Sequence, residues 1–258
     1  MIPKIIHYCW FGGNPKPELA QRCIKSWKKY CFGYRIIEWN ESNYDLSQAP
    51  LYVRQAYEAK KWAFVTDYVR LQVVYENGGI YVDTDVEFRK RPDSLLCNNA
   101  YFGFETPVHV ATGLGFGAVK GCPILREMMK DYEHIPFCLE DGVYDTTPCP
   151  VRNTEAFVRH GLKLDGTMQK LDGGVLILPQ EYLAPSGNSA EGLKITKNTI
   201  SIHWFAGSWC AEDVQKEREE FFHWMKQKKM MEFLSRTGKC LLGEQFYLWL
   251  KDRVKRKK

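Results

Sequence analysis

The sequence predicts an α/β protein, in which the strands of a mixed sheet alternate with helices. Residues 5–11 form a dense apolar run that stops at Gly12-Gly13, as a central strand entering a loop would. Residues 17–30 then place apolar side chains at helical spacing, and residues 34–39 repeat the strand pattern. A strand, a helix and a second strand in this order are typical of an alternating β/α sheet.

A helix near 51–59 is followed by a longer helix that begins at Trp62 and stops at Gly78-Gly79. This second helix is apolar on nearly every side, so we expect it to be buried. Within it, Asp67 and Arg70 are three residues apart and share one face. A buried charge must be paired, so these two side chains either form a structural ion pair or bind a sugar or phosphate.

Two carboxylates follow the next predicted strand, 80–82, at its carboxyl end. Asp83 and Asp85 are separated by a single residue. Hard divalent cations such as Mg²⁺ and Mn²⁺ prefer several oxygen ligands, and two acids at the end of a strand can supply them. The sequence therefore predicts a metal and phosphate site at this point.

The later elements are shorter and less regular. Prolines are scattered through 134–174, and such irregular segments often shape a substrate pocket. The glycines of 113–117 do not satisfy the GxGxxG spacing, so they indicate either tight backbone near a pocket or small residues in a strand. The further elements that we expect are strands at 100–105, 114–119, 174–179 and 199–203 and helices at 123–132 and 155–159.

Two aromatic or imidazole side chains leave predicted strands toward loops. Trp10 ends the first strand and either stacks on a nucleobase or belongs to the core. His203 ends the last strand and precedes Ser208 and Trp209. It either completes a metal or diphosphate site or is structural.

The basic excess of the chain lies at its C-terminal end. Residues 211–258 hold 13 Lys and Arg against 8 Asp and Glu, which accounts for the net charge of +5. Their aromatic and basic side chains predict a helical extension that either lies on an anionic membrane surface or caps the fold and ends in a disordered basic tail. No nucleic-acid-binding motif is present, so we expect no nucleic acid partner.

The cysteines and the apolar runs indicate the compartment. Nine cysteines without a CxxC pair indicate buried thiols in a reducing environment. The N-terminus lacks the features of a signal peptide, and no apolar run reaches the length of about 18 residues that a membrane span needs. We therefore expect a cytoplasmic protein, peripheral at the inner face of the membrane.

Four segments together resemble glycosyltransferase family 32, the group with the Och1-like and capsular polysaccharide transferases, distantly related to the clostridial glucosylating toxins. They are IPKIIHYCWFGG at the start, TDYVRLQVVYENGGIYVDTDVE from Thr66 to Glu87, the segment from Leu176 to Pro185 with ILPQEYLAP, and HWFAGSW from His203. The resemblance spans 1–210 and implies a GT-A type nucleotide-sugar-binding fold, a Rossmann-like mixed sheet flanked by helices, with 211–258 as a C-terminal helical extension.

The resemblance also implies roles for single residues. Asp67 and Arg70 hold the donor sugar, Asp83 contacts the ribose and the metal, and Asp85 is the direct metal ligand. The remaining assignments are Trp10 stacking on the base, Tyr81 lining the donor site near the phosphates, and His203, Ser208 and Trp209 closing over the diphosphate. Family members often have Thr-Gly-Pro where this chain has Thr146-Thr147-Pro148, which leaves the role of that loop open.

The implied reaction is retaining transfer of a hexose from a nucleotide sugar to a glycan or a lipid-linked saccharide in polysaccharide biosynthesis, with Mn²⁺ or Mg²⁺. UDP-hexose is the favoured donor and GDP-mannose the next. One alternative is a haloacid-dehalogenase-like phosphatase with Asp83 as nucleophile and Asp85 as acid/base, although no downstream acidic Mg²⁺ motif is present. The other is a membrane-associated sugar-binding protein without catalysis.

Overall fold

The computed structural model of the chain describes residues 1–140, 142–185 and 193–207. An eight-stranded mixed sheet runs through this part in the order β2-β1-β3-β7-β5-β9-β8, with β6 paired to β5. The predicted α/β class, a mixed sheet flanked by helices, is confirmed. The strands of this sheet are β1 (Ile5–Cys9), β2 (Arg35–Trp39), β3 (Gly79–Tyr81), β5 (Ala100–Thr106), β6 (His109–Ala111), β7 (Phe116–Ala118), β8 (Gln169–Leu171) and β9 (Val175–Leu178).

The first half of the sheet is parallel. β1 lies between β2 and β3 and runs parallel to both, whereas β7 pairs antiparallel with β3 and with β5. The carboxyl ends of β1, β2 and β3 therefore meet at one edge of the sheet, which is where open α/β sheets bind their ligands. Asp83 and Asp85 follow β3 directly at this edge.

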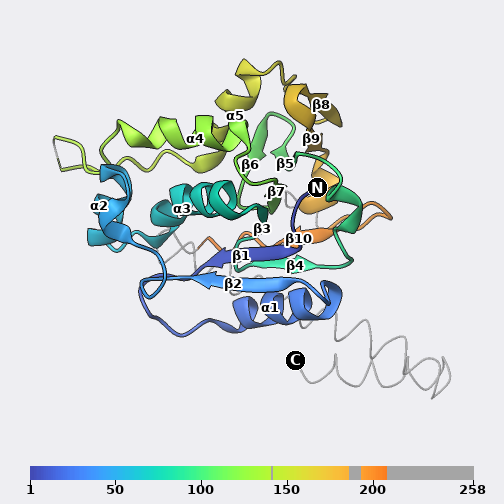
Figure 1. Cartoon of the computed structure of the whole chain (residues 1–258), viewed down its shortest axis with the longest axis horizontal. Coiled ribbons are helices and arrows are strands. Elements are labelled where there is room, and N and C mark those ends of the chain that lie inside the picture. Colours follow the sequence, from blue (N-terminus) through green and yellow to red (C-terminus); the bar gives the residue numbers. More distant parts are fainter. Residues whose placement is uncertain (141, 186–192, 208–258) are drawn as a thin grey trace, which may run out of the picture. The chain divides into compact units, whose positions relative to one another are not determined.

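Helices cover both faces of the sheet. Figure 1 shows α3, α4 and α5 on one side of the sheet and α1 on the other. The α-helices are α1 (Glu18–Tyr30), α2 (Leu51–Glu58), α3 (Trp62–Asn77), α4 (Pro123–Glu133), α5 (Cys149–Arg159) and α6 (Gln180–Leu183), and short 3₁₀ turns lie at Leu46–Gln48, Asp93–Leu95 and Asp172–Gly174.

The central strands of the sheet are buried on both faces, and their side chains alternate between two apolar clusters. Tyr81 and Phe102 belong to the cluster on the α3 side, whereas Ile80, Val82 and Tyr101 belong to the cluster on the α1 side. Successive side chains of a strand point to opposite faces, so a strand buried on both sides reads as a continuous apolar run. This explains why IIHYC and GIYV show no polar alternation.

The Gly78-Gly79 stop after α3 is confirmed. Gly78 adopts φ 68° and Gly79 φ 117°, and a Cβ on Gly79 would lie 2.8 Å from the Ile5 carbonyl oxygen. His7 of β1 closes this junction, because its Nε2 lies 2.9 Å from the Gly78 carbonyl oxygen and its Nδ1 accepts from Trp39 Nε1 at 3.0 Å. Burial lowers the pKa of His7 to about 4, so the ring is neutral.

A separate two-stranded antiparallel ribbon, which the sequence did not predict as such, lies beside α1. It pairs β4 (Val86–Phe88) with β10 (Ser201–His203). The helix α1 holds β4 in place: Trp27 Nε1 donates to the Val86 carbonyl oxygen at 2.6 Å, and Ser26 Oγ accepts from the Phe88 N–H at 2.9 Å. The pairing brings β10 close to the residues that follow β3.

Other differences from the sequence-based prediction are local. The first strand ends at Cys9, and β6, β8 and α6 were missed because elements of three or four residues show no clear periodicity. The helix α5 begins at Cys149 rather than near Glu155, since Pro148 and Pro150 suggested an irregular segment. Proline is well tolerated in the first turn of a helix, where its missing N–H has no helical partner anyway.

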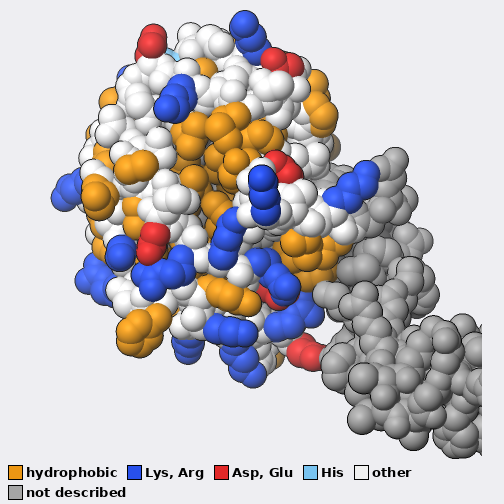
Figure 2. Space-filling view, turned by 90° about the vertical axis from the view of Figure 1, so that its right-hand side faces the viewer, with side chains coloured by type: hydrophobic (Ala, Val, Ile, Leu, Met, Phe, Trp, Pro, Cys, Tyr) orange, Lys and Arg blue, Asp and Glu red, His pale blue; other side chains and the backbone are white. Residues whose placement is uncertain are grey.

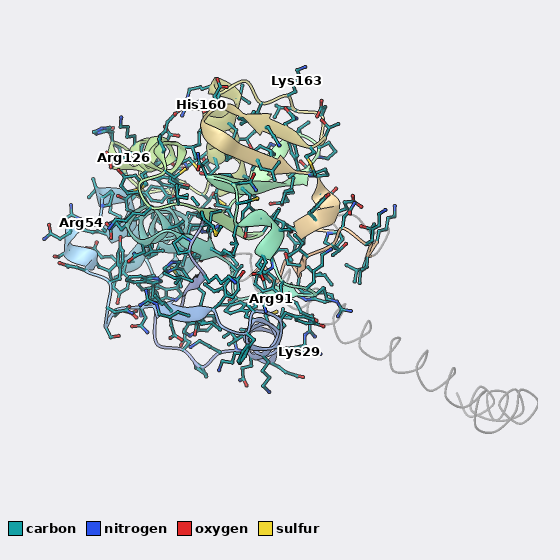
Figure 3. All side chains as sticks on the ribbon, turned by 45° about the vertical axis from the view of Figure 1, so that its right-hand side comes forward. Lys29, Arg54, Arg91, Arg126, His160 and Lys163 are labelled. Atoms are coloured by element: carbon teal, nitrogen blue, oxygen red, sulfur yellow. The ribbon has the colours of Figure 1, made fainter. Side chains whose placement is uncertain are left out.

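The surface shows how charge is distributed over the described part. In the view of Figure 2, apolar side chains gather in a hollowed central area, and Lys and Arg gather below it, at the level of α1 in Figure 1. Lys29, Arg54 and Lys163 are exposed and lie at the periphery of the described part in the view of Figure 3. Of the described cysteines, Cys9, Cys23, Cys31 and Cys122 are buried thiols as expected, whereas Cys97 is exposed and Cys138 and Cys149 are partly buried. No helix of the described residues is long and apolar enough to cross a membrane.

Candidate metal and donor site

Asp83 lies at the end of β3, where three groups from different elements meet it. Its N–H donates to the Gly113 carbonyl oxygen at 3.3 Å, which fixes the backbone. Its Oδ1 accepts from the Tyr81 hydroxyl at 2.9 Å and lies 3.3 Å from Arg70 Nη2. About a quarter of the side chain is solvent-accessible (27 %), so one part of the carboxylate is held from inside while another part faces the site.

Arg70 of α3 is the centre of a buried charge cluster. Its Nη2 lies 3.1 Å from Asp67 Oδ1 and 3.3 Å from Asp83 Oδ1. Its Nε donates to the Thr66 carbonyl oxygen at 3.0 Å, and Nη2 donates to Thr66 Oγ1 at 3.1 Å. The side chain is only 4 % exposed. The ion pair between Asp67 and Arg70 is thus present, and it extends to Asp83, which the sequence did not predict.

The charges of this cluster influence one another. The pKa of Asp67 is raised to about 6, chiefly by burial, with Arg70 opposing the shift and the Asp83 carboxylate adding to it. Burial also raises the pKa of Asp83, with Asp85 adding to the increase and Arg70 opposing it. Burial disfavours the charge on Arg70, but the carboxylates outweigh it and hold its pKa well above the usual value. Arg70 therefore stays charged and is the counter-ion of two acids.

A second group of polar side chains supports Arg70 from α5 and from the residue that follows β6. Arg70 Nη1 lies 3.4 Å from Thr112 Oγ1 and 3.6 Å from Cys149 Sγ. Asn153 Nδ2 donates to Thr112 Oγ1 at 2.9 Å, whereas Asn153 Oδ1 has no hydrogen-bond partner among the described residues. Burial raises the pKa of the Cys149 thiol well above its usual value, so this thiol is neutral. The cluster is therefore a structural support that fixes the guanidinium plane.

Gly113 is a glycine because Asp83 leaves no room for a side chain. A Cβ at this position would lie 2.4 Å from Asp83 Oδ2 and 3.4 Å from Arg70 Nη1. Of the two sequence interpretations of the glycines in 113–117, the tight backbone is thus present at Gly113. The close approach lets the backbone of 112–114 wall one side of the carboxylate.

Asp85 faces a different partner. Its Oδ1 lies 3.1 Å from His203 Nε2, and the two side chains are 15 % and 12 % exposed. The pairing of β10 with β4 sets this contact, because His203 is opposite Val86 and the Trp204 N–H donates to the Asp85 carbonyl oxygen at 3.1 Å. Burial disfavours a charged His203 ring, but the Asp85 carboxylate outweighs it and raises the pKa of His203.

The three ligand-type side chains Asp83, Asp85 and His203 come together. One ligand atom from each lies within 4.8 Å of the others. His203 Nδ1 is buried and has no hydrogen-bond partner among the described residues. Two carboxylates and an imidazole suit an octahedral divalent ion such as Mn²⁺ or Mg²⁺, which accepts oxygen ligands and a nitrogen. The residues present therefore fit the cation that the sequence predicted.

Tyr81 is fully buried rather than open to a ligand. It is 1 % exposed, its hydroxyl orients Asp83, and its ring lies 5.2 Å from the Arg70 guanidinium carbon. It thus touches both charged groups that define the site. Its predicted position in the donor site near the phosphates stays a prediction.

The remaining predicted residues are Trp10, which the structure describes, and Ser208 and Trp209, which it does not. Trp10 is partly buried: its Nε1 donates to the Asn14 carbonyl oxygen at 2.7 Å, and Lys16 Nζ lies 5.4 Å from its ring centre. Its stacking on a base stays a prediction. Ser208 and Trp209 lie outside the described residues, as does the predicted extension 211–258.

The sequence-based prediction missed several supporting residues. Thr66, one turn before Arg70 on α3, carried a usable signal, since residues four apart on a helix are neighbours. Thr112 and Asn153 carried none, because only the fold brings β6 and α5 to Arg70.

Comparison with known proteins finds similarity to glycosyltransferases. The family model described as "Glycosyltransferase sugar-binding region containing DXD motif" matches residues 17–102. Inositol phosphoceramide mannosyltransferase 3 of Schizosaccharomyces pombe is 28% identical over 140 residues, which are 53% of this chain and 38% of that protein. The chain therefore spans well under half the length of this relative.

Two solved structures match parts of the chain. The PaToxG glycosyltransferase has 18% sequence identity and a TM-score of 0.45, and the match covers 61% of this chain and 69% of that one. A glycosyltransferase involved in glycosylation of the major capsid of PBCV-1 has 14% identity and a TM-score of 0.45. That match covers 86% of this chain and 100% of the other.

Proposed function

We propose that the protein is a metal-dependent glycosyltransferase that uses a nucleotide-sugar donor, because residues 17–102 match the family model of glycosyltransferase sugar-binding regions with a DXD motif. The observation that supports this most directly is the meeting of Asp83, Asp85 and His203 at the carboxyl edge of the parallel strands. This is the place where an α/β sheet binds a nucleotide.

The leaving group explains why such a reaction needs this site. Breaking a sugar-phosphate bond builds negative charge on the departing diphosphate, and a divalent ion at the site supplies Lewis-acid stabilisation of that charge. Asp83 and Asp85 are held where they can bind the ion, and Arg70 fixes the orientation of Asp83. A proton donor for the leaving group is not required, which agrees with a site built from carboxylates and one imidazole.

Asp67 has a separate task in the proposal. It is 7 % exposed and pairs with Arg70. Both residues lie on α3, which is followed by β3 and then by Asp83 and Asp85. A carboxylate that is fixed by a guanidinium is a strong acceptor for the hydroxyl groups of a sugar. We propose that Asp67 orients the hexose while Arg70 keeps that carboxylate ionised.

The finer features of the reaction are also part of the proposal. Transfer proceeds with retention of configuration by front-face attack, to a glycan or a lipid-linked saccharide. The sequence resemblance places UDP-hexose first among donors and GDP-mannose second. The name of the Schizosaccharomyces pombe relative supports mannose as a transferred sugar. A contact of the basic segment 211–258 with an anionic membrane is proposed from its composition, and liposome sedimentation with and without 240–258 tests it.

The decisive experiment follows nucleotide release from a panel of UDP- and GDP-sugars with and without Mn²⁺. Wild-type protein should consume at least one donor only with the metal, and Asp85→Asn should reduce the rate by about 10²-fold or more, since it weakens the site that stabilises the leaving group. Asp172→Asn, an exposed acid in a surface turn, is the matched control and should retain full activity. Full activity in Asp85→Asn, or consumption of no donor by wild type, would refute the proposal.

A further inference from the structure

A hollow of about 490 Å³ opens where the chain leaves β1. Its volume is in the range of small-molecule and cofactor sites. It lies at the carboxyl edge of β1, and β1 pairs in parallel with β3, the strand that leads into Asp83. The residues of its lining that matter below are Gly12, Gly13, Glu41, Tyr57, Lys60 and Trp62.

The helix α3 links this hollow to the charged cluster. Trp62 is the first residue of α3, and Asp67 and Arg70 follow on the same helix. At a rise of 1.5 Å per residue, Arg70 is about 12 Å from Trp62 along the axis. A ribose and the first phosphate of a nucleotide bridge a gap of this order. The hollow is thus placed for the base of a donor whose diphosphate lies at Asp83 and Asp85.

One wall of the hollow is aromatic. Gly12 adopts φ 86°, and a Cβ on it would lie 2.6 Å from Trp62 Cε2, so the indole rests directly on the glycine backbone. The ring of Tyr57 packs edge-on to the Trp62 ring at 5.2 Å. Gly13 has open space on its side-chain side. A fixed aromatic ring beside open space is a stacking platform for a planar base.

The polar edge of the hollow is formed by a carboxylate that is held in position. Glu41 Oε1 accepts from the Gly12 N–H at 2.6 Å and from the Tyr57 hydroxyl at 3.2 Å. Its second oxygen, Oε2, has no hydrogen bond to any residue that the structure describes. An ionised carboxylate accepts hydrogen bonds and donates none. The Glu41 carboxylate therefore favours a ligand whose facing edge carries only hydrogen-bond donors.

A cation completes this edge. Lys60 lines the same hollow and has φ 57°, a left-handed backbone conformation that is uncommon for residues other than glycine. Its N–H donates to the Tyr57 carbonyl oxygen at 2.9 Å, which closes the turn after α2. Strained backbone of this kind is retained mostly where a site requires it. The turn thus adds a donor side chain to the hollow that the acceptor Glu41 also lines.

We propose that this hollow selects the base of the donor and that the preferred base is guanine; the inference rests on the proposed function. Guanine presents two adjacent donors, N1–H and the N2 amino group, next to the acceptor O6. Glu41 matches the two donors, and Lys60 matches O6. Uracil presents one N–H between two carbonyl oxygens, so a carboxylate gains one hydrogen bond and meets a repelling oxygen beside it.

This inference changes two expectations from the sequence. It places a guanosine diphosphate sugar ahead of the UDP-hexose that the family resemblance favoured. It also assigns base stacking to Trp62, whereas Trp10 has its indole N–H bound to the backbone and is not among the residues that line the hollow. Glu41 and Lys60 become residues that determine donor specificity.

The test measures binding of GDP and UDP to the full-length protein by titration calorimetry in the presence of Mn²⁺. GDP should bind at least about 10-fold more tightly than UDP. Glu41→Gln should weaken GDP binding by about 10–100-fold, as expected for a lost charge-assisted pair of hydrogen bonds, and should change UDP binding little. Lys60→Met should weaken GDP binding by a smaller factor, and Trp62→Leu should weaken both nucleotides. Glu58→Gln, an exposed acid on α2, is the matched control.

Each outcome separates the two proposals. Equal or tighter binding of UDP by wild type, or an equal loss for both nucleotides in Glu41→Gln, would overturn guanine selection and leave the glycosyltransferase proposal intact. Binding of neither nucleotide would overturn the proposed function, and guanine selection with it. Unchanged circular dichroism in the variants excludes unfolding as the cause of a loss.

Discussion

The two sides of the metal-ligand set are built in different ways. Asp83 is fixed from within, by Arg70 of the neighbouring helix and by Tyr81 of its own strand. Asp85 is fixed by His203, which arrives from a distant part of the chain on the ribbon of β4 and β10. The first side is tied to the core of the protein, whereas the second is tied to a short peripheral pairing. Substitutions on the first side should therefore affect folding as well as function, and substitutions on the second side mainly function.

Arg70→Met should give the largest loss of stability. It would leave Asp67 and Asp83 buried without their shared cation, and removing one partner from a buried ion pair costs about 3–5 kcal/mol. Urea unfolding measures the change. Arg126→Met removes a more exposed ion pair with Glu133 on α4 and should cost less than about 1 kcal/mol. Equal effects of the two substitutions would show that the buried cluster does not stabilise the fold.

Acid should lower the free energy of unfolding through His7, whose ring is hydrogen-bonded to Gly78 at the junction of α3 and β3. Its pKa is lowered to about 4 in the folded protein, from 6.5 in the unfolded chain. The stabilisation is complete above pH 6.5. It is lost as the pH falls toward 4, because the unfolded chain then binds a proton that the folded protein does not. The shift corresponds to about 3 kcal/mol.

The measurement compares unfolding of wild type and His7→Gln over this pH range. The glutamine variant has a neutral side chain at every pH, so it should start from a lower stability and show the smaller decrease. A decrease of the same size in both proteins would mean that other groups cause the acid sensitivity.

His203→Gln tests the second side and should change metal binding more than stability. Loss of one of three ligands should raise the Kd for Mn²⁺ by about 10–100-fold, of the order seen for ligand-orienting partners in metal sites. The unfolding free energy without metal should change by about 1 kcal/mol, as for an ordinary hydrogen bond. His160→Gln, which removes a surface pair with Glu127, is the control. An unchanged Kd would exclude His203 as a ligand.

The same contrast explains what the sequence could and could not predict. The block from Trp62 to Asp85 is contiguous, so helical spacing, the Gly78-Gly79 stop and the two acids after a strand were sufficient to single out Asp67, Arg70, Asp83 and Asp85 as candidate site residues. Such local patterns survive folding because each follows from backbone periodicity.

The rest depends on pairings that no local pattern encodes. The ribbon of β4 and β10 has three residues in each strand, too few for a visible alternation, and its register alone brings His203 to Asp85. The sequence analysis assigned no role to Glu41 and Lys60, and the fold gives them a shared hollow. Only the tertiary structure reveals which polar residues of a turn face a site.

The smallest effect is expected at the outer end of the ribbon, where Arg22 of α1 covers Trp204. The guanidinium lies 4.9 Å from the Trp204 ring centre and 3.5 Å from Glu87 Oε2, which also accepts from Trp204 Nε1 at 3.0 Å. Arg22 is about half exposed, so Arg22→Ala should lower the unfolding free energy by less than about 1 kcal/mol. Because Trp204 follows His203 directly, the Kd for Mn²⁺ should rise by a few-fold through looser positioning. A Kd change as large as that of His203→Gln would mean that the ribbon is held chiefly from α1 and that the second side is as rigid as the first.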